Sequence, residues 1–220
     1  MNQPIVYAIF PTPIYVIDCD DDIQESVDFL NKDHELIPNR HAMEYGNKTV
    51  DDYILDNPEC AKLKSFITTH LEKYASDLLA WEFEKFQITQ SWVTMKKPGE
   101  THSKHFHPNS ILSAVFYFQD VDINSFSPLV FHRPDAVYQL MHQFAPWENE
   151  EKKQHTEFPW NEWKCEPRKN RLIIFPSWLH HSVNPNRSDL VRKSLAVNAV
   201  PTGKFGCRMH STELDINKLK

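Results

Sequence analysis

The sequence predicts a mainly β fold of the α+β class, in which N-terminal helices buttress one sheet of a double-stranded β-helix, a cupin-like jelly roll. Three observations predict it. Apolar residues recur at helical spacing before residue 82, and from Phe86 onward they alternate with polar residues at a period of two. Histidines then lie on two strand-like segments far apart in the chain, the order expected of a jelly roll with a metal site.

Length and composition agree with a single domain over residues 1–220. The chain has 220 residues, of which 40% are hydrophobic, so it can bury one large core without a second domain. We expect an N-terminal helical part at about 20–82 and an insertion at about 134–166 near the pocket mouth. The insertion either shapes substrate choice or packs its tryptophans against the barrel.

The N-terminal part predicts an edge strand and two helices. Ile5 to Ile17 is β-branched and interrupted by prolines, which favours an edge strand or an extended arm. Asp22 to Asp33 has apolar residues at helical spacing behind acidic capping candidates. His34 to Asp56 is polar and irregular, and is either a lid or a surface connection. A longer helix begins at Asn57-Pro58 and carries an apolar stripe that we expect to pack against a sheet.

The later segments predict antiparallel strands. Residues 86–95 alternate in polarity, whereas Ile111 to Phe118 is apolar on both faces and therefore belongs at the centre of a sheet. Further strands are predicted at Leu129 to Phe131, Leu172 to Phe175 and Ser194 to Val200.

The histidines predict a metal site. Side chains in a strand alternate between faces, so His105 and His107 point the same way and can hold one ion, although a purely structural pair would look the same. Only one member of His180-His181 can reach that ion, for the same reason. His102 is a possible substitute ligand, but it follows a turn-like stretch. Imidazole binds zinc, copper, iron and nickel, so the histidines alone do not select the metal.

An arginine close to the distal histidines indicates what kind of ligand binds beside the metal. A guanidinium holds a carboxylate through two parallel hydrogen bonds, so a buried Arg192 beside a metal indicates an acidic organic ligand. On a strand, Arg192, Ser194, Ala196 and Asn198 share one face, opposite an apolar face. A strand of this kind lines a cavity. Arg192 alone would most often be a solvated ion-pair residue.

These segments resemble the 2-oxoglutarate- and Fe(II)-dependent oxygenases of bacteria and their phages, over roughly residues 7 to 201. The segments that carry the resemblance are Trp92 to Met95, His105 to Ser110, Leu112 to Tyr117, Phe175 to Val183 and Arg192 to Asn198, with Phe10 to Pro13 at the start of the domain. The resemblance implies that iron is held by a His-x-Asp/Glu pair and a distal histidine. It also implies that an arginine, often followed by x-Ser, clamps the far carboxylate of 2-oxoglutarate.

Carried over residue by residue, the resemblance makes His105 the first ligand, His181 the distal ligand, and Arg192 with Ser194 the co-substrate clamp. The chain departs from the pattern at His107, where the family has an acid. Three neutral imidazoles leave a ferrous site at +2 rather than +1, and dianionic 2-oxoglutarate brings it near neutrality. His107 is either the third ligand or a neighbour of the metal. Because imidazole must be neutral to bind a metal, metal affinity is expected to fall below about pH 6.

Three further residues are candidate contacts. Trp92, Tyr117 and Asn198 are placed to orient the metal-bound rings or to touch 2-oxoglutarate, because ligands and bound acids need oriented partners. Trp92 and Tyr117 are equally well read as ordinary core aromatics.

The expected function is that of an Fe(II)- and 2-oxoglutarate-dependent dioxygenase, an oxidoreductase that uses O2 to hydroxylate a substrate and releases succinate and CO2. Three alternatives stay open. A cupin-type metal protein would keep the histidines without needing Arg192, and a non-catalytic jelly-roll binding or structural module would need neither. A structural zinc site would hold a metal that iron cannot functionally replace. The sequence does not identify the primary substrate or the oligomeric state.

Composition narrows the compartment and the partners. A net charge of −6 without a dense basic block argues against nucleic acid as the main partner. The four cysteines are widely spaced, which favours a reducing cytoplasm over a disulfide framework. No apolar run approaches the roughly 20 residues of a membrane span, and the start lacks the features of a signal peptide.

Overall fold

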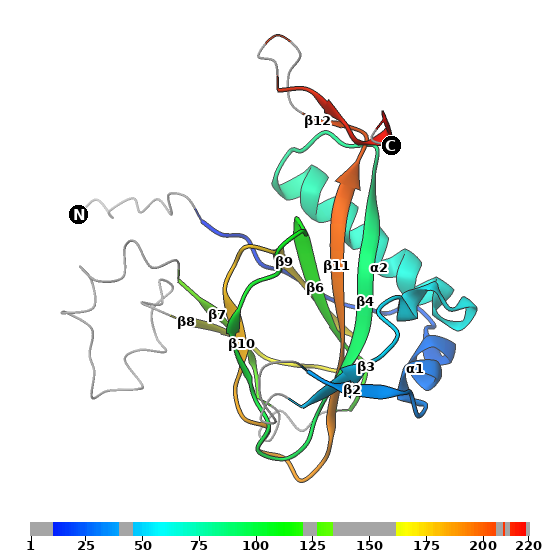
Figure 1. Ribbon diagram of the computed structural model, residues 1–220, viewed down its shortest axis with the longest axis vertical. Coiled ribbons are helices and arrows are strands. Elements are labelled where there is room, and N and C mark those ends of the chain that lie inside the picture. The colour runs from blue at the N-terminus through cyan, green and yellow to red at the C-terminus, as the bar shows by residue number, and fades with distance from the viewer. Residues whose placement is uncertain are drawn as a thin grey trace, which may run out of the picture.

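Two antiparallel sheets face each other in the computed structural model, which describes residues 11–39, 46–120, 127–133, 162–205, 209 and 212–218 (Figure 1). The larger sheet has seven strands in the order β1 (Tyr15–Asp18), β9 (Arg171–Pro176), β6 (Leu112–Tyr117), β11 (Arg192–Thr202), β4 (Lys85–Lys96), β3 (Asn47–Thr49) and β2 (Leu36–Pro38). The smaller sheet has four in the order β5 (His102–His105), β10 (His181–Val183), β7 (Leu129–His132) and β8 (Glu162–Cys165). This arrangement confirms the predicted double-stranded β-helix.

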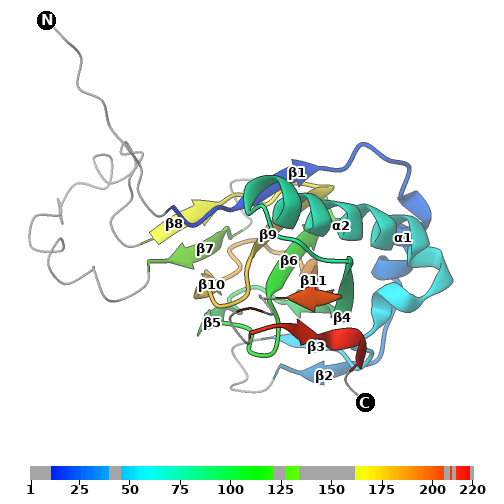
Figure 2. The ribbon, with the colours of Figure 1, turned by 90° about the horizontal axis from the view of Figure 1, so that it is seen from above.

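Helices cover the outer face of the larger sheet, as predicted (Figure 2). They are α1 (Gln24–Asn31) and α2 (Ala61–Lys73), which continues as a π-helical turn at Tyr74–Leu78; short 3-10 turns lie at Ile54–Asp56, Pro58–Cys60 and Ile216–Lys218. The stripe of α2 is buried at Leu63, Ile67 and Leu71, and it packs in one cluster with Val93 and Leu195 of the sheet. Leu78, the last residue of the π-helical turn, is exposed, so the apolar stripe does not reach the end of that turn.

Strand parity separates this apolar core from a polar interior. Along β4 and β11, Val93 and Leu195 face the helices, whereas their neighbours Trp92, Thr94 and Ser194 face the space between the two sheets. A second apolar cluster joins the sheets on the other side of that space, and its buried members are Tyr117, Leu129, Phe131, Cys165, Ile173, Phe175, Leu179 and Val183. The interior between the sheets is therefore polar at one end and apolar at the other.

The predicted strands are confirmed, and the prediction of an irregular segment at 34–56 needs correction. Where it is described, β2 pairs with β3 and β3 pairs with β4, so the segment extends the larger sheet, and its residues Asn39, Lys48 and Tyr53 line a cavity. The predicted insertion at 134–166 ends in strand β8, which pairs with β7; its residues 134–161 lie outside the described residues.

Further elements agree with expectation or add detail. The predicted edge strand is β1, paired only with β9 among the described strands, and residues 5–10 of that prediction lie outside them. Asn170 has a φ of 62°, the left-handed conformation that an asparagine tolerates at a turn before β9. A two-stranded ribbon, β12 (Lys204–Phe205) with β13 (Leu214–Asp215), follows β11. Among the described residues, no helix is long and apolar enough to span a membrane.

Candidate metal centre

Three histidines converge where β5 and β10 lie side by side. His181 is the direct cross-strand partner of His105, and the backbone N–H of His107 donates to the Ser177 carbonyl just beyond the end of β5. The candidate ligand nitrogens of His105, His107 and His181 all lie within 4.8 Å of one another. The structure therefore brings together the three histidines that the sequence indicated.

Hydrogen bonds fix which nitrogen of each ring faces the centre. The Nδ1 atom of His105 bonds the Ser103 carbonyl at 2.8 Å, and Nδ1 of His181 bonds the Leu179 carbonyl at 2.9 Å. Nδ1 of His107 bonds Oδ1 of Asn198 at 2.7 Å. Each acceptor is a carbonyl oxygen, so Nδ1 must carry the proton and Nε2 keeps its lone pair. Three Nε2 atoms are thus available as ligands, and carbonyls that orient a ring in this way are typical of metal sites.

Burial keeps the three rings neutral. Desolvation, with the proximity of His105, lowers the pKa of His107 to about 4. The same two causes, burial first, hold the pKa of His181 well below its usual value. Burial also lowers the pKa of His105. Neutral imidazole is the form that binds a metal, so the cluster can bind one throughout the physiological pH range.

The neighbouring histidines are placed differently. His180 lies against Phe106, with ring centroids 5.2 Å apart, so His181 is the member of the pair that reaches the cluster. His102 stacks on His105 at 4.2 Å, and burial lowers the pKa of His102 to about 2. His102 is therefore a neutral ring beside the three histidines rather than one of them.

Arg192 lies buried in the same interior, with 3% of its surface exposed. One terminal N–H donates to the hydroxyl of Tyr117 at 3.1 Å, and the guanidinium carbon lies 5.4 Å from the centre of that ring. Its Nε is buried without a hydrogen-bond partner. No ion pair joins Arg192 to a carboxylate among the described residues. A buried guanidinium in this condition fits an anionic ligand.

The strand register adds two polar residues that the sequence reasoning missed. Ser194 lies opposite Thr94, and their hydroxyl oxygens are 2.9 Å apart. Arg192 lies opposite Lys96, which is only 2% exposed. Burial, together with the charge of Arg192, lowers the pKa of Lys96 to about 8. The available signal was parity, because Thr94 and Lys96 share the face of Trp92 in the alternating strand.

The three candidate contact residues all lie at the site. Trp92 stacks with His107 at a centroid distance of 5.9 Å and an angle of 18° between the rings. Asn198 accepts from His107 and from Ser113 through the same Oδ1 atom. Tyr117 is buried and contacts Arg192 rather than the histidine rings. Trp92 and Asn198 therefore orient a histidine, and Tyr117 orients the arginine.

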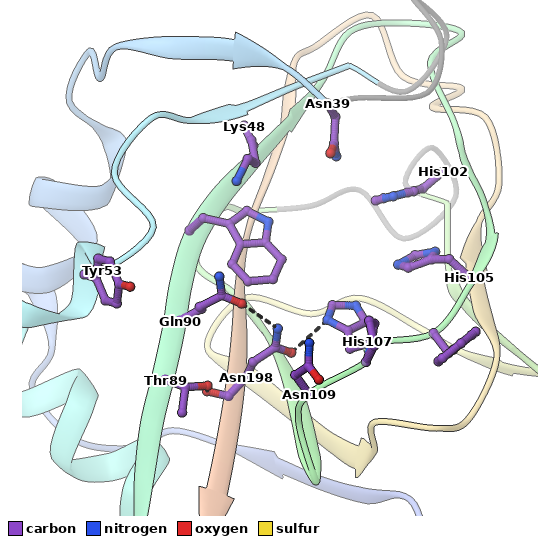
Figure 3. A pocket seen from close by; sticks show the side chains of 13 residues that line it. Asn39, Lys48, Tyr53, Thr89, Gln90, His102, His105, His107, Asn109 and Asn198 are labelled. Atoms are coloured by element: carbon purple, nitrogen blue, oxygen red, sulfur yellow. Dashed lines mark hydrogen bonds between the residues drawn. The ribbon is translucent and has the colours of Figure 1, made fainter. Parts of the chain in front are cut away.

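Two cavities meet at the histidines. An inner cavity of about 60 Å³ is bordered by His105, His107, His181, Arg192 and Lys96, among others. An outer cavity of about 600 Å³ opens on the other side of His105 and His107 (Figure 3). Its remaining lining is mostly uncharged and polar, and consists of Asn39, Lys48, Tyr53, Thr89, Gln90, Trp92, His102, Phe106, Pro108, Asn109 and Asn198. One pocket thus approaches the cluster from the arginine side, and the other from the open side.

Comparison with known proteins agrees with this geometry. A family model described as "Putative 2OG-Fe(II) oxygenase" matches residues 90–198, the span that holds the three histidines and Arg192. No curated protein matches the chain. The fold and the pocket define a jelly-roll protein with a histidine cluster that could hold a metal ion. The matched span, just under half of the chain, is therefore similar to the 2-oxoglutarate- and Fe(II)-dependent oxygenases, which are oxidoreductases.

Solved structures share the fold at low sequence identity. A 2OG-Fe(II) oxygenase family oxidoreductase from Burkholderia pseudomallei is 12% identical over 84% of this chain and 83% of that one, with a TM-score of 0.56. A Pseudomonas putida prolyl-4-hydroxylase is 15% identical over 87% and 94%, with a TM-score of 0.58. HygX from Streptomyces hygroscopicus, solved with nickel and 2-oxoglutarate bound, is 12% identical over 87% and 84%, with a TM-score of 0.56.

Proposed function

We propose that the chain is a dioxygenase that hydroxylates a C–H bond of its substrate, with Fe(II) held by His105, His107 and His181. One atom of O2 enters the substrate as the new hydroxyl, and the other enters succinate as 2-oxoglutarate loses CO2. The observation that carries the proposal is the convergence of three imidazole rings beside a buried arginine that has no described carboxylate partner. Bound iron supplies the oxygen chemistry, and the protein supplies position and shielding.

The donor set fits the metal. Imidazole nitrogen suits iron, and three protein ligands would leave further positions on the ion for an oxo acid and O2. The carboxylate of the usual triad is replaced by His107, whose ring is fixed by Asn198. Each neutral imidazole leaves the ionic charge unchanged, so the centre keeps the full +2 of a ferrous ion and favours a dianionic co-substrate.

The surroundings of Arg192 fit 2-oxoglutarate. Its unpartnered Nε can donate to a carboxylate, and the Tyr117 hydroxyl accepts from Arg192, so the phenolic O–H remains available as a donor. Ser194 adds a hydroxyl on the same strand face. These residues would hold the far carboxylate, while the oxo acid end faces the histidines.

Reconstitution under anaerobic conditions tests the proposal. Fe(II) followed by 2-oxoglutarate should give the visible metal-to-ligand charge-transfer band of a chelated 2-oxo acid, and admission of air should release succinate. His181→Ala should abolish the band, whereas His180→Ala, a matched change at the adjacent histidine, should keep it. Arg192→Ala should raise the 2-oxoglutarate concentration needed for half of the band by about 10-fold or more, because a charged hydrogen bond is lost.

Other outcomes would direct the assignment elsewhere. If the wild type binds iron but gives no band, the chain is a cupin-type metal protein without 2-oxoglutarate chemistry. If the His181→Ala variant still binds the metal, the histidine cluster has a structural role. That outcome favours the alternative of a non-catalytic binding module. An undiminished band in Arg192→Ala would remove the proposed clamp.

We propose a cytoplasmic location. Three cysteines, Cys19, Cys60 and Cys165, are free and buried, which agrees with a reducing compartment. The link to phages stays a prediction from the sequence resemblance.

A further inference from the structure

We propose that the outer cavity binds an uncharged molecule that carries several hydroxyl groups, a sugar or a sugar alcohol, and that Asn109 helps to select it. This inference rests on the proposed function, because the bound molecule would be the compound that is hydroxylated beside the histidines. It adds the chemical class of that compound, which neither the fold nor the histidine cluster indicates.

Charge is scarce among the described residues that line the outer cavity. Apart from the histidines, Lys48 alone among them carries a charge, and it forms an ion pair with Asp52 at 2.5 Å. Its ammonium group also lies 5.6 Å from the centre of the Trp92 ring. A phosphate or a carboxylate would have to compete with Asp52 for this cation while it lost its own hydration. The cavity therefore favours an uncharged ligand.

Side-chain amides supply the polarity of this cavity instead. Asn39, Gln90, Asn109 and Asn198 all line it, and Figure 3 shows Asn39 on the side opposite Gln90 and Asn109. An amide both donates and accepts hydrogen bonds, as a hydroxyl group does. Polar groups on several sides of a cavity suit a ring that carries hydroxyl groups around its rim. A flat nucleobase, in contrast, forms its hydrogen bonds within one plane.

A β-bulge adds further polar groups to the cavity. Asn198 of β11 pairs with Gln90 of β4, and the next residue of β11 pairs with Ile88, so Thr89 is an extra residue in β4. Thr89 and Gln90 both line the cavity, although neighbours in a regular strand point to opposite faces. Gln90 accepts from Asn198 through Oε1 at 3.4 Å, so its own amide N–H groups serve as donors. The bulge thus presents a hydroxyl and an amide side by side.

The backbone of Asn109 indicates that its amide serves a ligand. Asn109 lies in the turn that follows β5, two residues after His107, and its φ is 59°. Glycine adopts this left-handed conformation at less cost than any residue with a side chain. Asparagine tolerates it, so the turn alone does not require an amide here. We infer that the side chain is present because it lines the cavity.

Size and apolar surface also fit a sugar. The cavity has a volume of about 600 Å³, within the range of small-molecule sites. Tyr53 is 57% exposed and lies across the cavity from the histidines, and Phe106 is 49% exposed (Figure 3). The C–H face of a sugar ring packs on an aromatic ring while its hydroxyl groups stay free to bond the amides. Because His105 and His107 border the same cavity, a C–H bond of the bound ring can lie beside the histidine cluster.

Ligand-observed NMR tests this binding without turnover. The full chain, loaded with diamagnetic Zn(II), is screened by saturation-transfer difference against neutral monosaccharides, disaccharides and sugar alcohols at millimolar concentration. Sugar phosphates, sugar acids, nucleosides and capped dipeptides form the comparison set. At least one neutral polyhydroxylated compound should bind. Its protons should relax faster when paramagnetic Mn(II) replaces Zn(II), because the cavity borders the histidines.

Asn109→Gly removes the amide and leaves a residue that suits the backbone of the turn. It should weaken binding of the neutral compound by about 3-fold to 10-fold, as expected for the loss of one or two neutral hydrogen bonds. Asn170→Gly is the matched control, because Asn170 also has a left-handed φ, 62°, but lines neither cavity. The control should bind as wild type does. Equal binding by Asn109→Gly and wild type would show that Asn109 does not select the ligand.

The remaining outcomes separate this inference from the proposed function. If none of the neutral polyhydroxylated compounds binds, or if members of the comparison set bind more tightly, the assigned class is wrong. Unchanged relaxation with Mn(II) would also reject the assignment, because the ligand would then lie elsewhere. A chain that gives the charge-transfer band but binds no such compound would keep the proposed function and lose this inference. A chain that binds one but gives no band would keep the site and lose the proposed function.

Discussion

At the scale of single residues, Asn198 connects the candidate metal centre to the strand that carries the arginine. Its Oδ1 accepts from Nδ1 of His107 at 2.7 Å and from the Ser113 hydroxyl at 2.9 Å, while its amide N–H donates to Gln90 at 3.4 Å. The amide cannot turn over without losing these bonds together. Asn198 therefore fixes both the tautomer and the direction of the one histidine that replaces the usual acid.

Asn198→Ala should weaken metal binding by about 10-fold to 100-fold, because partners that orient a ligand ring typically contribute that much to affinity. Competition titration with Co(II) against a chelating dye measures the change. Asn31→Ala, at an exposed asparagine of α1 whose amide bonds the Val27 carbonyl, is the matched control and should bind metal as wild type. Unchanged affinity in Asn198→Ala would show that packing, and not this hydrogen bond, holds His107.

At the scale of elements, the pairing of β4 with β11 separates stability from chemistry. One face of the two strands packs on α2 through Val93 and Leu195, and the other face lines the site. Because successive residues alternate, a change on the helix side need not alter the orientation of a site residue one position away. The helix stabilises the sheet without contributing a residue to the pocket.

Ile67→Ala, in the middle of α2, should therefore lower the free energy of unfolding by about 2–5 kcal/mol, since Ile67 is fully buried and its loss leaves a cavity. Urea unfolding followed by circular dichroism measures the loss. Thr69→Ala, on the exposed side of the same helix, should change it by less than about 0.5 kcal/mol. Metal affinity of the folded Ile67→Ala protein should match wild type; a parallel loss would mean that the helix shapes the site directly.

At the scale of the whole molecule, local sequence patterns predicted helices and strands. Pairing between segments distant in the sequence determined which residues lie opposite one another and which weakly patterned segments become strands. The period of two from Phe86 and the shared face of Arg192 and Ser194 are local, and both were confirmed. Parity alone puts Lys96 on the face of Trp92, but only the register of β4 with β11 shows that it lies opposite Arg192. Strands β2 and β3 were missed because they are short and have little apolar periodicity, so their strand conformation depends on pairing with β4.

The whole cluster of histidines should also make the metal-free protein sensitive to acid. Burial lowers the pKa of His102 to about 2 and of His107 to about 4, and it lowers those of His105 and His181 as well, whereas a histidine in the unfolded chain titrates near 6.5. Below about pH 6.5 the unfolded chain therefore binds more protons than the folded one, and stability falls as pH falls toward about 4.

The same low pKa values mean that metal affinity should be lost only below the pH of about 6 that the sequence alone indicated.

Thermal melting of the metal-free protein should give a lower Tm at pH 5.0 than at pH 7.5. His102→Phe, which keeps a stacked ring but cannot take up a proton, should reduce that difference, whereas His34→Phe, at a histidine that bonds the Phe29 carbonyl away from the cluster, should leave it as in wild type. Equal melting temperatures at the two pH values would mean that the rings accept protons in the folded state as readily as in the unfolded chain, and the neutral three-imidazole centre would then be wrong.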